Sequence, residues 1–316
     1  MLGNAEIDTT YRLLLGRAAD PAGLEHYARL AREGLTLDEL RQSLLQSEEY
    51  RSVAIAGDQV MVDMGHAKVV VDAGEPEFGR HISQNASWEP HIMALIRANL
   101  KPGDTYVDIG ANVGVMAFVA AAKIGSSGRV IAFEPHPDNI RHFLAGVSAN
   151  GYRNITLHGF GLSDATSVFS LIGSSNGYLM PQSQSTFQTV TMPGDAILAD
   201  VPRIDMVKID IEGHEPFALV GLERTLRRHR PIVLCEFNPR CLQEHVGCPP
   251  PAFAEQLFGL TDYIQVVEHD GRTSTVATPY ELLTLWEERN REAVTTGFLP
   301  DGMVHFDLLF TVGKVA

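Results

Sequence analysis

The stretch Thr105–Met116 constrains the fold of this chain more than any other. An apolar run ends at Ile109, a turn of small residues covers Gly110–Gly114, and small and apolar residues continue from Val115 to Ile124. Strand, glycine turn and helix in this order are typical of the opening unit of a parallel α/β sheet. Such a unit has a ligand crevice at the carboxyl end of its strand, so binding residues are expected at that edge.

The charges around this turn indicate which ligand the crevice binds. Asp108 lies at the end of the strand, and the turn contains no Lys or Arg. This carboxylate would repel a polyphosphate, because phosphate-binding loops offer N–H groups and a nearby cation. Glu134 follows the next strand, Arg129–Phe133, at a place where an acid commonly holds ribose hydroxyls. A nucleoside with a cationic tail and no phosphate fits both acids, which describes S-adenosylmethionine, with S-adenosylhomocysteine as product. Either motif alone could instead be a structural turn or a surface Glu.

Composition limits the partners of the chain. Its 316 residues include 39 acidic and 25 basic side chains, for a formal charge of −14. A nucleic acid held by its backbone needs clustered cations, so the acidic excess argues against a nucleic-acid partner. The basic cluster Arg224–Arg230 lies at the end of an expected helix, where it complements the helix dipole.

The cysteines and the N-terminus favour a cytoplasmic protein. The three cysteines are odd in number and lack metal-type spacing. The segment Met1–Asp8 contains no basic and then apolar signal region. No apolar run is long enough to span a membrane, so no membrane span is expected.

Residues 1–56 are expected to form a small helical domain with a docking or dimerisation role. Asp20 precedes Pro21 as an N-cap, and Thr36–Glu39 reads as a capping box. The alternating valines and the glycines of residues 57–86 predict a connecting hairpin.

A motif in the N-terminal segment carries a family resemblance of its own. The pattern in Tyr11–Tyr27, together with Ser47–Tyr50, resembles a bacterial domain-of-unknown-function family that is often attached to secreted or glycan-related proteins. The resemblance implies no chemistry. It leaves open whether the segment forms a homodimer, docks a partner or only packs as an N-terminal cap.

Residues 87–316 are expected to form the catalytic domain. Helices alternate with strands throughout this region, which indicates a doubly wound, mostly parallel sheet. The last strand, Val304–Val312, could pair antiparallel with its neighbour. The segment Gly173–Thr191 is rich in Ser, Gln, Asn and Gly and predicts a mobile loop or a hairpin with a loose tip.

A second group of ionisable residues follows the strand Ile204–Ile211. Lys208, Asp210 and Glu212 are expected on one face, because successive side chains of a strand alternate. Charges on a central strand are costly unless they reach a polar site or pair with one another. An ion pair of Lys208 that only satisfies the strand end is therefore the alternative. Glu236 ends the next strand and is expected at the same edge.

The same edge could gather further ligands. His91, at the start of a preceding helix, could reach it. A divalent metal held by Asp210, Glu212, His214 and Glu236 is conceivable, since oxygen-rich sets suit Mg or Ca. The spacing fixes no coordination geometry, and no metal is predicted.

Seven short segments between residues 88 and 236 carry a further resemblance. They are Trp88–Pro90, Lys101–Asp104, Val107–Gly114, Phe133–Pro135, Leu162–Asp164, Lys208–Glu215 and Pro231–Glu236. With them the chain resembles an FkbM-type S-adenosylmethionine-dependent methyltransferase, and Lys208–Glu215 is the most diagnostic part. The resemblance implies a class I methyltransferase fold, a Rossmann-like α/β architecture with a seven-stranded, mostly parallel sheet and helices on both faces. It also implies O-methylation of a hydroxyl on a small-molecule, glycan or lipid acceptor such as a sugar, glycolipid or polyketide.

The resemblance also implies roles for individual residues. Around the cofactor it places Asp108, Gly110, Asn112 and Gly114 at the methionine part, Glu134 at the ribose, Ser163 and Asp164 near the adenine, and Glu89 at the methionine end, with Pro135 and Asp210 as further cofactor-binding candidates. Asp210, Glu212 and Glu236 are expected to face the acceptor. The catalytic candidates are Asp210, Glu212 and His214. The acceptor-binding candidates are His91, Glu215, Glu236 and Asn238.

The expected reaction is an in-line displacement in which an acceptor oxygen takes the methyl group from sulfur. The protein then contributes mainly alignment and exclusion of water. The acceptor hydroxyl must lose a proton, and Asp210 is the first candidate base, ahead of Glu212 and His214. A catalytically lapsed scaffold or binding protein is the alternative. A nucleic-acid methyltransferase is disfavoured by the charge and by the lack of an Asn/Asp-Pro-Pro-aromatic motif.

Overall fold

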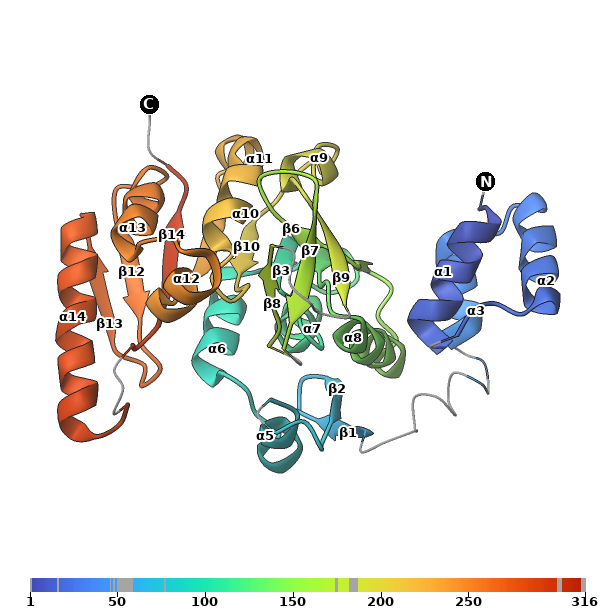
Figure 1. Cartoon of the computed structure of the whole chain (residues 1–316), viewed down its shortest axis with the longest axis horizontal. Helices are drawn as coiled ribbons and strands as arrows, with labels where there is room; N and C mark the ends of the chain where they lie inside the picture. Colours follow the sequence, from blue (N-terminus) through green and yellow to red (C-terminus); the bar gives the residue numbers. More distant parts are fainter. Residues whose placement is uncertain are drawn as a thin grey trace. The chain divides into compact units, whose positions relative to one another are not determined.

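The computed structural model describes residues 2–15, 17–45, 47, 49, 59–76, 78–173, 176–181, 187–299 and 303–313. The chain divides into two compact units, whose helices and strands are labelled in Figure 1. One comprises Met1–Trp88 with Pro137–Tyr152, and the other comprises Glu89–His136 with Arg153–Ala316. The boundaries expected near residues 56 and 86 stay predictions, and residues 50–58 lie outside the described ranges.

The first unit contains a helical bundle. Its helices are α1 (Asn4–Leu15), α2 (Pro21–Arg32), α3 (Leu37–Leu45) and α8 (Pro137–Asn150). Their apolar sides meet in a core that includes Ile7, Leu14 and Leu40, with Leu144 of α8 packed against it. The chain folds locally as predicted: Asp20 accepts the amide of Gly23, and Thr36 and Glu39 exchange capping hydrogen bonds.

Contacts within this unit explain part of the N-terminal motif. Arg17 donates to both carboxylate oxygens of Glu49, at 2.5 and 2.8 Å, and its guanidinium lies over the ring of Tyr11. A Cβ at Gly23 would lie 2.5 Å from the Tyr11 hydroxyl, so a larger residue at this position would have to displace the Tyr11 ring. The motif residues Glu48 and Tyr50 lie outside the described residues. Dimerisation or docking through these helices stays a prediction.

The predicted hairpin is confirmed for the residues that are described. Strands β1 (Gln59–Asp63) and β2 (Lys68–Asp72) pair antiparallel. Asn150 of α8 bonds both the amide and the carbonyl of Lys68, at 2.8 and 2.6 Å. Helix α5 (Phe78–Asn85) follows the hairpin.

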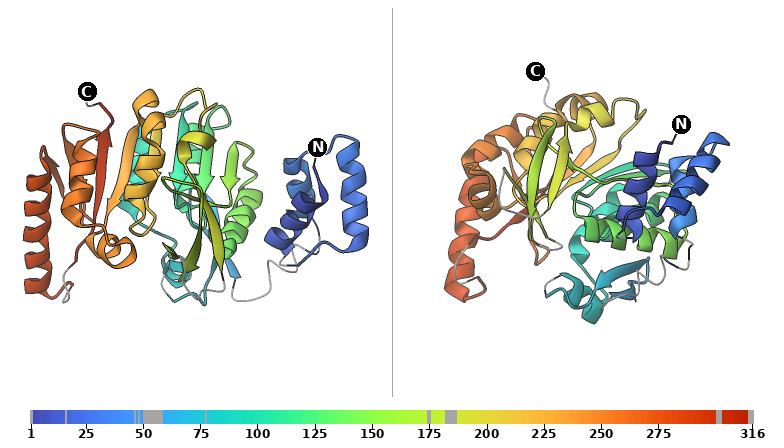
Figure 2. Two further views of the ribbon diagram at one scale, coloured as in Figure 1. Left: turned by 45° about the horizontal axis from the view of Figure 1, so that its top comes forward. Right: turned by 45° about the vertical axis from the view of Figure 1, so that its right-hand side comes forward.

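The second unit is built on an eight-stranded sheet with helices on both faces (Figure 2). The strand order is β13-β12-β14-β11-β10-β3-β4-β5. The strands are β3 (Thr105–Ile109), β4 (Arg129–Phe133), β5 (Ile155–His158), β10 (Met206–Ile209), β11 (Ile232–Phe237), β12 (Ile264–Val267), β13 (Thr273–Val276) and β14 (Phe306–Thr311). The helices are α6 (Pro90–Asn99), α7 (Val115–Ile124), α9 (Gly194–Ile197), α10 (Glu215–Gly221), α11 (Glu223–His229), α12 (Pro239–Val246), α13 (Pro250–Phe258) and α14 (Pro279–Thr296).

The sheet confirms the α/β fold and differs from the expectation in one strand. Strands β5, β4, β3, β10 and β11 are parallel to one another, and β14 runs antiparallel beside β11, as the sequence allowed. The strand beyond the expected seven is β13, which pairs with β12 and so extends the sheet at its edge.

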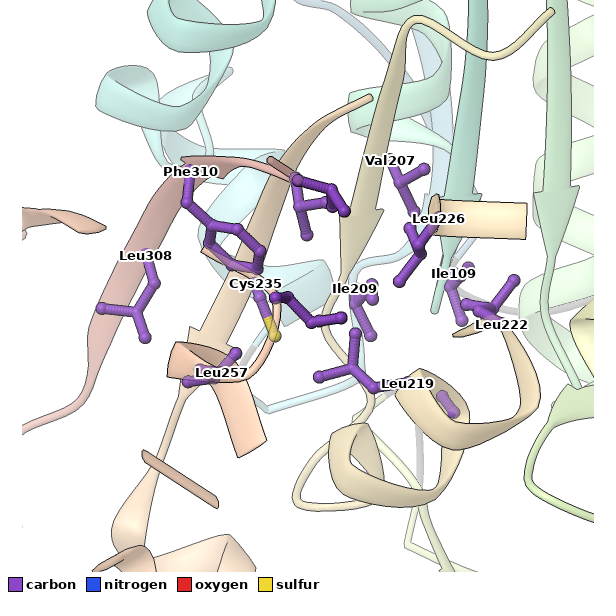
Figure 3. Close-up of a cluster of buried hydrophobic side chains, with 14 of the residues drawn as sticks. Ile109, Val207, Ile209, Leu219, Leu222, Leu226, Cys235, Leu257, Leu308 and Phe310 are labelled. Atoms are coloured by element: carbon purple, nitrogen blue, oxygen red, sulfur yellow. The ribbon is translucent and has the colours of Figure 1, made fainter. Parts of the chain in front are cut away.

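Strand alternation gives this sheet one apolar and one charged face. Figure 3 shows the apolar face, where Ile109, Ile209 and Cys235 lie beside one another under the side chains of α10 and α11. The register places Ile209 opposite both Ile109 and Cys235, and Cys235 opposite Leu308. The residues next to these in sequence therefore point to the other face, and there they include charged side chains near the carboxyl edge.

A four-stranded sheet overlaps the segment Gly173–Thr191 predicted as a loop or loose hairpin, and it also includes two strands that precede the segment. It has the order β6-β9-β7-β8 and consists of β6 (Gly161–Leu162), β7 (Ser167–Ile172), β8 (Tyr178–Met180) and β9 (Gln188–Met192). Strands β8 and β9 do not pair with each other as a hairpin within the predicted segment would require, because each pairs antiparallel with β7, which precedes it. Residues 174–175 and 182–186 of the predicted loop lie outside the described residues.

Within the described ranges, no helix has both the length and the apolar character that crossing a membrane requires.

The packing of α10 next to β6 predicts that Gly221 cannot be replaced by a larger residue without loss of stability. A Cβ at Gly221 would lie 2.0 Å from the carbonyl oxygen of Ser163, and backbone cannot rotate away as a side chain can. Gly221→Ala is expected to lower the free energy of unfolding by about 3 kcal/mol, measured by urea titration followed by circular dichroism.

Gly247→Ala is the matched control. Gly247 has φ +67 with no atom within 4 Å of its added Cβ, so the substitution meets only backbone strain. We expect a loss of about 1 kcal/mol there. Equal losses at the two positions would contradict the close approach of α10 to Ser163.

Candidate active site

The glycine turn between β3 and α7 has the structure that the sequence predicts. Gly110 has φ +83, and a Cβ there would lie 1.9 Å from the carbonyl oxygen of Asp210. Gly114 begins α7 with φ +100. Asn112 also has positive φ, and its side-chain oxygen accepts the amide of Val113 at 2.8 Å. The turn therefore approaches the end of β10 closely enough for both loops to share one site.

Glu134 joins the second predicted cofactor position to this turn. Its side chain is buried, and one carboxylate oxygen accepts the amide of Asn112 at 2.8 Å. The other oxygen accepts the amide of His136 at 2.7 Å, across Pro135. The structure thus brings Asn112 and Glu134 together at the ends of two adjacent parallel strands.

Ser163 and Asp164 lie next to a histidine that the sequence assigned to catalysis. The Ser163 hydroxyl lies 3.0 Å from an oxygen of Asp164 and 2.9 Å from Nε2 of His214. His214 is 2% exposed and packs between the rings of Phe169 and Phe217. Burial lowers the pKa of His214 to about 4, so its ring is neutral near pH 7. This geometry suits a residue that positions Ser163 better than one that takes a substrate proton.

A buried ammonium lies at the centre of the charged face of the sheet. Lys208 is 5% exposed, and its Nζ lies 2.7 Å from a carboxylate oxygen of Asp210. Burial acts to lower the pKa of Lys208, but the surrounding negative charges, first that of Asp210, hold the pKa above its ordinary value. Asp108 and Glu89 supply the other charges. The ion pair that the sequence left as an alternative is formed, and it belongs to a larger cluster.

Asp108 is the most completely buried acid of this cluster. It is 0% exposed and faces Lys208 across the β3–β10 pair. No hydrogen bond of good geometry reaches either carboxylate oxygen from a described residue, although Tyr106 and the Ala117 amide lie close enough to act to lower the pKa of Asp108. Burial, with a contribution from Asp210, raises its pKa to about 7 against the opposing charge of Lys208. A carboxylate that is buried without a hydrogen bond is costly and is commonly found at functional sites.

Glu89 reaches the same cluster from the residue before α6. Its backbone has φ +39, a conformation that is strained for a residue with a side chain. Burial and then the charge of Asp210 raise its pKa to about 7, while Lys208 acts to lower it. The strained backbone therefore holds a carboxyl that titrates near neutrality.

Glu236 and Asp307 extend the charged face along the sheet edge. They are opposite each other in the β11–β14 pair. One oxygen of Glu236 accepts the side-chain amide of Asn238 at 3.3 Å, and the other is buried with no bond to a described residue. Burial, and then the charge of Asp210, raise the pKa of Glu236 well above its ordinary value. The two predicted acceptor-binding residues Glu236 and Asn238 are therefore brought together.

His91 contacts a group of residues that the sequence did not single out. Its Nε2 lies 3.2 Å from an oxygen of Asp307, and its ring contacts that of His269. His269 in turn lies 2.6 Å from His305, measured between the two Nε2 atoms. A signal for these residues existed: an antiparallel last strand begins where the parallel strands end, which brings His305 and Asp307 to the site edge.

The region after β10 corrects one sequence expectation. Strand β10 ends at Ile209, and Glu212 lies in a turn with φ +55, so the prediction that Glu212 continues the strand face was wrong. Its carboxylate instead accepts the thiol of Cys241 at 3.4 Å. Glu215 is 1% exposed, and its Oε1 accepts the amides of Ile211 and Gly213. Glu215 thus stabilises this turn, because its carboxylate accepts hydrogen bonds from two backbone amides of the turn.

Across the described part of the chain, no group of three or more His, Cys, Asp or Glu side chains is arranged to hold a metal ion.

Comparisons with known proteins give this site a family context. The model of the methyltransferase FkbM domain matches residues 108–256. The hexuronic acid methyltransferase AglP of Haloferax volcanii is 28% identical over 144 residues, which cover 44% of this chain and 58% of that protein. The chain thus matches little more than half the length of this curated relative.

Solved structures also resemble the chain. Methyltransferase FkbM from Methylobacillus flagellatus is 17% identical with a TM-score of 0.41, over 96% of this chain and 58% of that one. A SAM-dependent O-methyltransferase from Thermotoga maritima is 14% identical with a TM-score of 0.42, over 82% and 95% of the two chains.

Asp108 is buried without a well-formed hydrogen bond, so we expect its ionised carboxylate to destabilise the ligand-free protein. Because its folded pKa lies near 7 and its ordinary value is 3.8, the folded state loses stability as pH rises from about 4 to 7. Asp108→Asn removes this loss. The melting temperature of the variant should therefore exceed that of the wild type by an amount that grows between pH 4 and 7 and stays constant above pH 7. Differential scanning calorimetry at pH 5, 6, 7 and 8 measures the gain.

Asp104→Asn is the matched control. Asp104 is equally buried, but its carboxylate accepts the amide of Lys101 at 3.0 Å and pairs with Arg203 at 3.1 Å. Its substitution should cost about 2 kcal/mol. A destabilised Asp108→Asn variant would show that this carboxylate has partners in the free protein.

Proposed function

Residues 108–256 belong to the FkbM-type methyltransferases, and from this premise we propose that the chain transfers a methyl group from S-adenosylmethionine to a hydroxyl of a sugar-like acceptor. The observation that carries the proposal is the charged face at the carboxyl edge of β3, β10 and β11. It lies beside the glycine turn, and it presents Asp108, Lys208 and Asp210 where a class I fold holds its ligands.

The residues present fit the cofactor. Glu134 is a buried acid at the end of β4 that binds the amides of Asn112 and His136, and a carboxylate oxygen can accept more than one hydrogen bond, which suits ribose hydroxyls. The turn at Gly110 and Asn112 offers backbone close to Asp210, and the unbonded oxygens of Asp108 can accept from an ammonium group. When bound, S-adenosylmethionine supplies a methyl group on a sulfonium, which an oxygen nucleophile can displace. Ser163 and Asp164, positioned by His214, are assigned to the adenine end.

The acceptor side is supported by the chemistry of the adjoining acids. Glu236, Asp307 and Asp210 offer carboxyl oxygens, and hydroxyl groups donate well to such acceptors. The relative AglP carries hexuronic acid in its name, which supports a sugar as the acceptor class. Asp210, fixed by Lys208, orients the acceptor, because a held carboxylate accepts a hydroxyl hydrogen bond in a defined direction.

Two measurements test this proposal. Isothermal titration calorimetry with S-adenosylmethionine should give a binding heat, whereas a lapsed scaffold would give none. Incubation with cofactor labelled in its methyl group and with D-glucose, D-galactose, D-glucuronic acid or methyl glucosides should then label a sugar. A methyl ether is stable in mild alkali and a methyl ester is not, so alkali treatment shows which oxygen was methylated. Binding without transfer to any sugar would contradict the sugar acceptor.

Asp210 gives the sharpest substitution test. Asp210→Asn keeps the size and shape of the side chain but removes its negative charge, which pairs with the Lys208 ammonium. The rate of methyl transfer should therefore fall at least about 100-fold. Cofactor affinity, measured by calorimetry, should stay within a few-fold of the wild type. Asp200→Asn, at an exposed position, is the control and should transfer at the wild-type rate. Unchanged turnover in Asp210→Asn would remove Asp210 from the mechanism.

A further inference from the structure

One pair of the charged face lies outside the segment that matches the family. His91 stands in the first turn of α6 and Asp307 in β14, whereas the family match covers residues 108–256. The two side chains are 13% and 12% exposed, so they are shielded but reachable. Asp307 is also the register partner of Glu236, which places the pair next to the proposed acceptor side.

The hydrogen bond between His91 and Asp307 determines which ring nitrogen of His91 can accept a proton. A carboxylate only accepts, so Nε2 of His91 carries the proton that it donates to Asp307 at 3.2 Å. In the neutral ring Nδ1 then holds the lone pair. A histidine oriented by a carboxylate in this way is the usual arrangement of a general base.

The other acids of the face are less suited to taking a proton. The carboxylate of Asp210 is held by the Lys208 ammonium at 2.7 Å, which stabilises its charged form and weakens it as a base. One oxygen of Glu236 already accepts the Asn238 amide and the other is buried, and burial raises the pKa of Glu236 well above its ordinary value, which favours the neutral carboxyl over the carboxylate that a base requires. His214 is bonded to Ser163 inside the protein.

We propose that His91 is the general base of the methyl transfer and that Asp307 positions it, an inference that rests on the proposed function. The acceptor hydroxyl gives its proton to Nδ1 of His91. Its oxygen forms the new bond to the methyl carbon while the bond from sulfur to that carbon breaks, and the bonding electron pair stays on sulfur. His91 leaves the step as an imidazolium beside the Asp307 carboxylate, and it returns its proton to water.

The charges that face His91 agree with this role. The hydrogen bond to Asp307 is the largest influence and raises the pKa of His91, burial acts to lower it, and Glu89 adds to the rise. The neighbouring His269 and His305 have lowered pKa values, burial being the main cause. The two rings are therefore mostly neutral at the pH at which His91 titrates. They do not compete with the His91 imidazolium for the negative charge of Asp307.

The test compares four variants, the last of them a control, with the wild type, on the sugar of the panel above that the wild type methylates fastest. His91→Gln should lower kcat at least about 100-fold with cofactor affinity within a few-fold, and free imidazole should restore part of the rate to His91→Ala. Asp307→Asn should move the acidic limb of the kcat profile to lower pH, because it removes the main cause of the raised pKa. Arg97→Gln, exposed on the same helix, should match the wild type throughout.

A second readout does not depend on turnover. NMR titration of ring-labelled histidines should show one resonance, absent in His91→Gln, whose pKa lies above the ordinary value and falls in Asp307→Asn. A wild type that methylates no sugar defeats the proposed function itself. An active wild type whose rate and pH profile survive in His91→Gln overturns only the base assignment, as does an alkali-labile methyl ester, because a carboxylate nucleophile has no proton to lose.

Discussion

The site depends on one buried ammonium. Lys208 projects from the central strand β10 into a face that also holds Asp210, Asp108 and Glu89, and its ammonium interacts with all three of these acids. Buried charges are tolerated only when they are paired, and one cation cannot neutralise three acids. The protein resolves this imbalance by raising the pKa values of Asp108 and Glu89 to about 7, so that they are partly protonated near neutral pH. The free site is therefore poised to accept positive charge, and a sulfonium-bearing nucleoside would supply it.

The architecture keeps this charge away from the core. Because side chains alternate along each strand, the apolar residues Ile109, Ile209 and Cys235 all fall on one face, and the charged residues fall on the other. The parallel strands end at one edge, and the antiparallel β14 begins there, so both classes of strand deliver acids to the same place. In the function that we propose, residues of β11 and β14 would form the acceptor side of the site, and residues of β3 and β4 would form the cofactor side.

The sequence predicted the local parts of this site and named His91 and Glu236 as residues that could reach its edge, but it did not identify Asp307, His269 and His305. The glycine turn, Glu134 and the Lys208–Asp210 pair depend on residues close in sequence or on adjacent strands, and they were found. Glu212 was misplaced because its positive φ ends the strand early, which no spacing rule shows. The contact of His91 with Asp307 spans 216 positions, and only the fold reveals it. His214 and Glu215 belong to a motif that the sequence indicates as a site. In the structure both are buried: His214 forms a hydrogen bond with Ser163, and Glu215 accepts the amide of Ile211 in the turn after β10.

A crystal structure with S-adenosylhomocysteine would test the central claim most directly. If the charged face is the cofactor site, the ribose hydroxyls should lie within hydrogen-bond distance of Glu134. The amino group of the methionine part should meet the oxygens of Asp108, and the sulfur should face the side of Asp210. A ligand bound elsewhere, or a face on which Asp108 and Lys208 remain closed off by packed side chains, would contradict the account.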